Sequence, residues 1–170
     1  IQASMETAPD FHPRKCRSVK TYEYRILNRR FPIPTLRRDT YFYYYPLDLQ
    51  KMQQAAGYLE GIHDFKSFCS IHTQASTTVR EIYACQVTKQ DDVITIRISG
   101  TGFLYNMVRI IAGTLIQVGS GELAPEKMLD ILEACDRQTA GPTAPANGLT
   151  MMGIEFLDDS WRKKEGLQDG

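Results

Sequence analysis

Residues 102–121, GFLYNMVRIIAGTLIQVGSG, constrain the fold more than any other part of the chain. The segment is almost wholly apolar, and Arg109 is its single charged residue. A helix over residues 102–118 would carry one apolar stripe, formed by Leu104, Val108, Ile111, Leu115 and Val118. Because the segment is short and contains an arginine, it predicts a helix that packs against a protein core along this stripe, and not a membrane span.

Arg109 lies about 100° around the helix axis from that stripe. Its neighbours at steps of three and four are small or polar, namely Tyr105, Asn106, Ala112 and Gly113. Such a face lets another backbone or a ligand come close. Two interpretations stay open on helical geometry alone. Arg109 reaches water or pairs with an acid elsewhere in the fold, or it binds a carboxylate or phosphate in a cleft.

Strand patterns surround this helix. Residues 18–27 alternate, with Tyr22 and Tyr24 facing one way and Thr21 and Glu23 the other. Residues 80–88 and 93–99 predict a hairpin that turns at KQDD, and TMMGIEFL near the end predicts a last strand.

Two further helices are indicated. Asp48 is typical of a helix N-cap, and Gly61 is expected to end that helix. Ala124-Pro125-Glu126 is expected to begin another. Strands mixed with two or three helices predict an α+β fold, in which a mostly antiparallel sheet has the helices packed on one face. We expect one domain over residues 1–157 and a disordered tail over residues 158–170.

The net charge of zero hides two polarised regions. Residues 14–38 hold nine basic residues and one acid, whereas residues 121–170 hold ten acids and five bases. The basic segment can attract phosphates, although chance clustering on a soluble surface is the alternative. The four cysteines and three histidines show no metal-ligand spacing, so we expect no metal site and reduced cysteines.

Four short sequence segments, taken in order along the chain, resemble those of a known family. They are DFHPR at residues 10–14, KTYEYRI at 20–26, GFLYNMVRIIAGTL at 102–115 and DRQTAGPTAPANGL at 136–149. With these blocks the chain resembles the TruA family of tRNA pseudouridine synthases. Thr101 departs from the asparagine that the family often has there. The family's G-R-T-D-x-G-V-H motif, which carries its nucleophilic aspartate, does not occur in the 170 residues. We therefore expect a C-terminal domain that is inactive alone.

The resemblance implies an isomerase that converts uridine to pseudouridine in the anticodon stem-loop of tRNA, at tRNA positions 38–40, without cofactor or metal. It implies three catalytic residues. Arg109 would pair with the nucleophilic aspartate, Tyr22 would stack on the target base, and Leu149 would pack against that base. From alternation alone, Tyr22 would be a core aromatic.

The same resemblance implies tRNA as partner, a homodimer, a cytoplasmic location and no membrane association. The residues expected to bind RNA are His12, Arg14, Lys15, Arg17, Lys20, Arg29, Arg30, Asn106 and Met107. Two other functions remain as alternatives: a non-catalytic RNA-binding module, and a structural or dimerisation domain.

Overall fold

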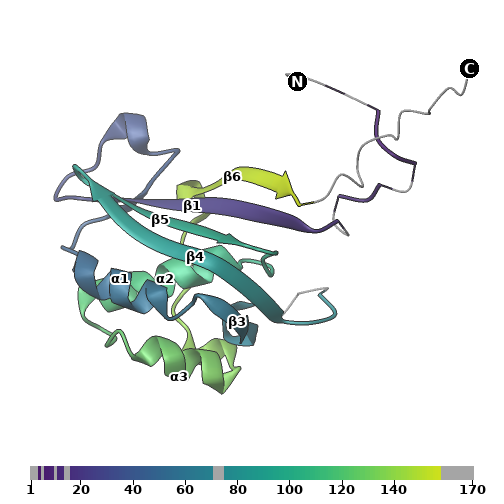
Figure 1. Cartoon of the computed structure of the whole chain (residues 1–170). Coiled ribbons are helices and arrows are strands. Elements are labelled where there is room, and N and C mark those ends of the chain that lie inside the picture. The colour runs from purple at the N-terminus through teal and green to yellow at the C-terminus, as the bar shows by residue number, and fades with distance from the viewer. Residues whose placement is uncertain (1–3, 5, 10, 14–15, 71–74, 158–170) are drawn as a thin grey trace, which may run out of the picture.

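A single sheet positions the other elements of the chain (Figure 1). The computed structural model describes residues 4, 6–9, 11–13, 16–70 and 75–157. Within that part of the chain six strands form the sheet, and they are Ser18–Asn28 (β1), Tyr41–Tyr43 (β2), Gly61–Asp64 (β3), Val79–Gln90 (β4), Val93–Gly100 (β5) and Leu149–Phe156 (β6). The residues expected to form a disordered tail, 158–170, lie outside the described residues.

The strand order is β2-β1-β5-β4-β3, and β6 also pairs with β1. The edge of β1 opposite β5 is shared, because β6 pairs antiparallel with residues 18–24 and β2 pairs parallel with residues 26–28. The other described pairings are antiparallel. The predicted α+β fold with a mostly antiparallel sheet is confirmed.

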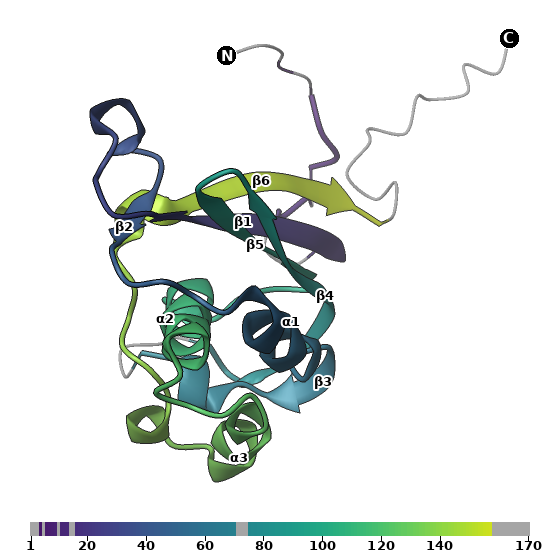
Figure 2. The same ribbon diagram turned by 90° about the vertical axis from the view of Figure 1, so that its left-hand side faces the viewer.

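Three α-helices, Leu49–Gly57 (α1), Met107–Ser120 (α2) and Lys127–Ala134 (α3), complete the described fold. Figure 2 shows α1 and α2 side by side against the sheet, with α3 farther from β1 and close to β3. The core forms between the sheet and these helices, and Tyr24 and Ile26 of β1 reach it fully buried. The helices therefore lie on one face of the sheet, as predicted.

The predicted cap of α1 is confirmed, but its predicted end is wrong. Asp48 Oδ1 accepts hydrogen bonds from the backbone N–H groups of Gln50 and Lys51, at 3.0 and 3.2 Å. The helix ends at Gly57 instead of Gly61. Gly61 begins β3 with a φ of 105°, a left-handed conformation that favours glycine and that a helix cannot contain.

α2 differs from prediction at its start and in its burial. It begins at Met107 and not at residue 102, because Asn106 has a φ of 61° and so interrupts right-handed helix. Eleven of its fourteen residues are buried, so the helix is enclosed on almost every side. The predicted single apolar stripe therefore covers less of the helix surface than the structure buries. Such all-round burial is typical of a central core helix.

Candidate active site

Arg109, in the first turns of α2, is a half-buried cation. Its Nε donates to the carbonyl oxygen of Ala144 at 2.6 Å, and its Nη1 donates to Asn106 Oδ1 at 3.1 Å. Asn106 in turn donates from Nδ2 to Ser70 Oγ at 3.0 Å. The four ion pairs found in the described part of the chain do not include Arg109. Its charge is therefore oriented by neutral groups and is not balanced by a described carboxylate.

The small face of α2 is covered by the chain itself. Residues 140–148, which we call the closing loop, run directly across it. A Cβ added to Gly113 would collide with the carbonyl oxygen of Pro142. The backbone N–H of Ala144 donates to the carbonyl oxygen of Arg109 at 3.1 Å. The close approach expected on this face is thus made by backbone, and only glycine at position 113 leaves room for it.

Tyr24 of β1 holds the closing loop from the other side. Its hydroxyl donates to the carbonyl oxygen of Pro145 at 2.7 Å, and its ring is fully buried. Burial raises the pKa of the Tyr24 phenol well above its usual range. The neighbouring Tyr41 raises this pKa further, and the Arg109 charge opposes the rise. The phenol therefore stays a neutral donor, and the loop is fixed between β1 and α2.

A cavity of about 290 Å³ opens beside Arg109. We call it the Arg109 cavity, and its lining includes Tyr22, Phe103, Asn106, Met107, Arg109 and Leu149. Tyr22 comes from β1, and its ring meets Phe103 edge-on with centroids 5.1 Å apart. Leu149 follows the closing loop and pairs with Tyr24, which places it beside the same strand. The structure thus brings together all three residues expected to be catalytic, with Asn106 and Met107.

The composition of this cavity limits what it can hold. It offers aromatic rings, apolar side chains and one guanidinium, and none of its described lining residues is a carboxylate. Pockets for drug-sized ligands are usually about 300–1,000 Å³, so this one suits a group as small as a single nucleobase. Tyr22 and Leu149 offer surfaces suited to a planar group, and Arg109 offers a charge suited to an anion.

Comparison with known proteins decides the family. The family model described as tRNA pseudouridine synthase matches residues 55–156, more than half of the chain. The chain belongs to the tRNA pseudouridine synthase family. The matched residues include all of α2 and all of β6, and therefore both Arg109 and Leu149.

Individual relatives agree with this assignment. The chain is 46% identical over 158 residues to tRNA pseudouridine synthase A of Brevibacillus brevis, covering 92% of this chain and 64% of that protein. It is 44% identical over 156 residues to the protein of the same name from a Thermoanaerobacter species, with the same shares covered. For the Bacillus subtilis protein the identity is 43% over 152 residues, covering 89% and 62%. The chain thus spans less than two thirds of the length of these curated relatives.

The residues expected to bind RNA lie in different parts of the structure. Asn106 and Met107 line the Arg109 cavity, and Lys20 lines a second cavity beside it. Arg29 and Arg30 follow the other end of β1, seven or more positions beyond Tyr22. At about 3.3 Å per residue this is on the order of 20 Å away. Arg29 forms an ion pair with Asp92 at 3.1 Å.

Of the remaining expected contacts, His12 and Arg17 are exposed, whereas Arg14 and Lys15 lie outside the described residues. The described residues contain no cluster of three or more side chains suited to hold a metal ion. None of their helices is long and apolar enough to cross a membrane.

Two features of the site were missed by sequence reasoning. Phe103 supports the Tyr22 ring, and the carbonyl oxygen of Ala144 holds Arg109. Phe103 gave a weak signal, because it is an aromatic residue directly after Gly102. A backbone carbonyl 35 residues away from Arg109 gives no sequence signal of any kind.

Proposed function

We propose that this chain supplies the arginine, tyrosine and leucine side of a pseudouridine synthase active site that acts on uridine in the anticodon stem-loop of tRNA. The nucleophilic aspartate comes from a G-R-T-D-type segment outside these 170 residues. By the family resemblance, the modified uridines are at tRNA positions 38–40. The same resemblance supports a cytoplasmic homodimer.

The main support for the proposal is the hydrogen bonding of the Arg109 guanidinium and its lack of a described acidic partner. Its Nε and Nη1 are held by neutral acceptors, and it has no described carboxylate partner. An oriented guanidinium with an unused edge suits a carboxylate that arrives from another segment. An arginine partner would keep that carboxylate ionised and aimed at the sugar.

The remaining lining residues suit the detached base. In pseudouridine formation the bond between uracil N1 and the ribose C1′ breaks, the base turns, and a bond from C5 to C1′ forms. The C5 proton leaves and N1 gains a proton, so the reaction needs no co-reactant. Tyr22 would stack on the base and Leu149 would pack against it, which keeps the base in place while it is detached.

Tritium release from tRNA labelled at uridine C5 tests the proposal. A polypeptide that contains both these residues and the aspartate motif is expected to release tritium, whereas the 170-residue chain alone is expected to release none. Release by the chain alone would show that the nucleophile lies within it. Absence of release from the longer polypeptide, together with intact tRNA binding, would favour a non-catalytic RNA-binding module.

A further inference from the structure

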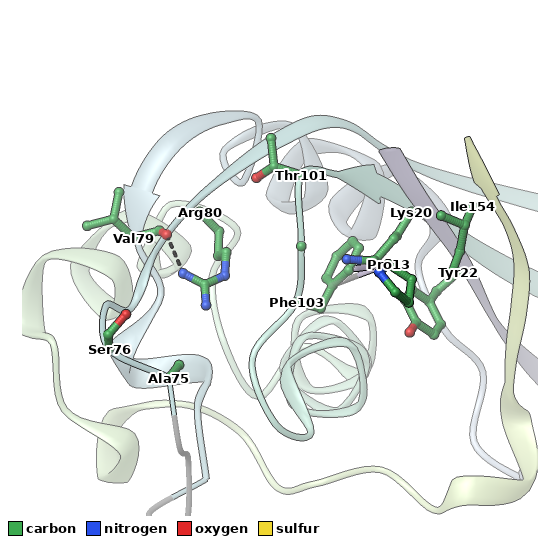
Figure 3. Close-up of a pocket in the computed structure, with 11 residues that line it drawn as sticks. Pro13, Lys20, Tyr22, Ala75, Ser76, Val79, Arg80, Thr101, Phe103 and Ile154 are labelled. Carbon is green, nitrogen blue, oxygen red and sulfur yellow. Dashed lines mark hydrogen bonds between the residues drawn. The ribbon is translucent and has the colours of Figure 1, made fainter. Parts of the chain in front are cut away.

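A second, larger cavity adjoins the Arg109 cavity and has two lining residues in common with it. Its volume is about 1,080 Å³, and the shared residues are Tyr22 and Phe103. We call it the Arg80 cavity. Figure 3 shows Arg80 on one side, Lys20 and Tyr22 on the other, and Phe103 between them. A nucleotide whose base occupied the Arg109 cavity could therefore extend its backbone past Tyr22 and Phe103 into this space.

The charge of the Arg80 cavity is positive. Lys20 and Arg80 line it, and none of its described lining residues is a carboxylate. Neither cation belongs to an ion pair in the described part of the chain. Since no acidic side chain among the described residues pairs with Lys20 or Arg80, both positive charges remain available to bind an anionic ligand.

Arg80 is held in place by backbone. Its Nη1 donates to the carbonyl oxygens of Thr77 and Val79, at 2.9 and 2.6 Å. These bonds leave Nε and Nη2 without a described acceptor. A Cβ added to Gly102 would lie 3.8 Å from Arg80 Nε, so the nearby backbone does not crowd this edge of the guanidinium. Arg80 thus presents a preoriented pair of donors, an arrangement suited to two phosphate oxygens.

The sheet places Lys20 opposite Arg80. Gly100, the last residue of β5, pairs with Lys20 of β1 on one side and with Ile82 of β4 on the other. The two cations therefore come from strands that flank the same end of β5. Neighbouring strands lie about 4.8 Å apart, so β1 and β4, with β5 between them, are on the order of 10 Å apart. Long lysine and arginine side chains can approach one phosphodiester from the two sides of such a gap.

We propose that the Arg80 cavity binds a backbone phosphodiester of the RNA strand, adjacent to the nucleotide whose base occupies the Arg109 cavity. Arg80 contacts the phosphate oxygens directly, and Lys20 adds a second positive charge. The proposal rests on the proposed function for the identity of that base. It assigns to Arg80 a role that the sequence did not indicate.

Equilibrium binding of a tRNA anticodon-arm hairpin tests this assignment, with the polypeptide that contains both these residues and the aspartate motif. Arg80→Gln is expected to weaken binding about tenfold, as for one lost charge-assisted hydrogen bond. It should also lower the slope of log affinity against log salt by about one. Lys20→Gln should lower the slope similarly. Lys89→Gln is the matched control, because Lys89 is exposed near the opposite end of β4 and should leave affinity and slope unchanged.

Neutral RNA linkages locate the contact. A methylphosphonate on one side of the target uridine should weaken binding by the wild-type protein, and Arg80→Gln should be insensitive to it. Equal losses in both proteins at every linkage tested, or an unchanged salt slope for Arg80→Gln, would overturn the subsite. These readouts do not require turnover. If the wild-type protein released no tritium but Arg80→Gln and Lys20→Gln lowered the salt slope as expected, only the proposed function would be rejected. If tritium release were normal but both variants kept the wild-type salt slope, only the phosphate subsite would be rejected.

Discussion

The two sides of α2 are packed in different ways. Toward the sheet and α1, large side chains such as Ile111 and Leu115 fill the core and are fully buried. Toward the closing loop, Gly113 and the backbone of Arg109 meet backbone directly. Side chains can adjust their rotamers when a neighbour changes, but two backbones in contact cannot. The loop side, which carries the candidate site, should therefore be the less tolerant of change.

The largest effect is expected at Arg109. In a polypeptide that also contains the aspartate motif, Arg109→Ala should lower turnover by about 10²–10³-fold or more, because it removes a preoriented charge from the reacting group. Binding of tRNA should change little. The measurement is tritium release beside equilibrium tRNA binding.

Arg137→Ala is the matched control for loss of loop support. Arg137 also donates to the closing loop, to the carbonyl oxygen of Ala140 at 3.2 Å and to Thr143 Oγ1 at 3.3 Å, but it does not line the Arg109 cavity. Equal losses of turnover in both variants would mean that Arg109 acts only by holding the loop.

Gly113→Ala should give the next largest effect. The new methyl group would collide with the carbonyl oxygen of Pro142, so the closing loop must move. We expect a loss of about 1–3 kcal/mol in the free energy of unfolding, typical of overpacking, together with reduced turnover. Urea denaturation measures the first quantity.

Gly57→Ala is the control for that substitution, because a Cβ at Gly57 in α1 would meet no atom from outside its own stretch of the helix within 4 Å. Its stability should stay the same or rise by up to about 1 kcal/mol. If Gly113→Ala proved as harmless as this control, the backbone contact would not be rigid.

Tyr24→Phe tests the opposite side of the closing loop. It removes the hydrogen bond to the carbonyl oxygen of Pro145 and should lower the free energy of unfolding by about 1–3 kcal/mol at pH 8. The raised pKa of Tyr24 adds a pH dependence. Its contribution is complete below the unfolded phenol pKa of about 10 and falls as pH rises above it, because only the unfolded chain then releases this proton.

The difference in stability between wild type and Tyr24→Phe should therefore narrow between pH 8 and pH 11. Urea midpoints at several pH values measure it. A difference that stayed constant, or that grew with pH, would contradict the burial of a neutral phenol.

The smallest effect is expected on the core side of α2. Ile111→Val removes one methylene group facing the core and should cost about 0.5–1.5 kcal/mol, with turnover unchanged. Thermal unfolding and tritium release together measure this. A loss of turnover as large as that of Gly113→Ala would remove the contrast between the two sides.

Local sequence rules predicted much of this fold. Residues 18–27 alternate, and Asp48 is a strong cap, so β1 and the start of α1 follow from patterns that local physics enforces. The start of α2 was not predictable in this way, because a left-handed residue such as Asn106 leaves an apolar pattern uninterrupted. The four-residue strand β3 also gave too short a pattern to identify.

The candidate site shows the same division. The three residues expected to be catalytic were named from family resemblance, and their approach to one cavity depends on contacts between distant segments. Helical spacing identified a small face around Arg109, but it could not show that the closing loop occupies that face. The Arg80 cavity was missed because it is formed by strand ends from separate parts of the sequence.

The pairing of β1 with β6 has a consequence for synthesis on the ribosome. β1 begins at Ser18, whereas Leu149 begins β6, and the hydrogen bond from Tyr24 to Pro145 joins residues 121 positions apart. Synthesis proceeds at about 5–20 residues per second, so Tyr22 and Arg109 leave the ribosome seconds before the segment that encloses them. Until β6 emerges, one edge of β1 has unpaired backbone groups along residues 18–24. The nascent chain therefore presents an open strand edge to chaperones, and β6, the last strand of the described residues, closes both that edge and the cavity beside it.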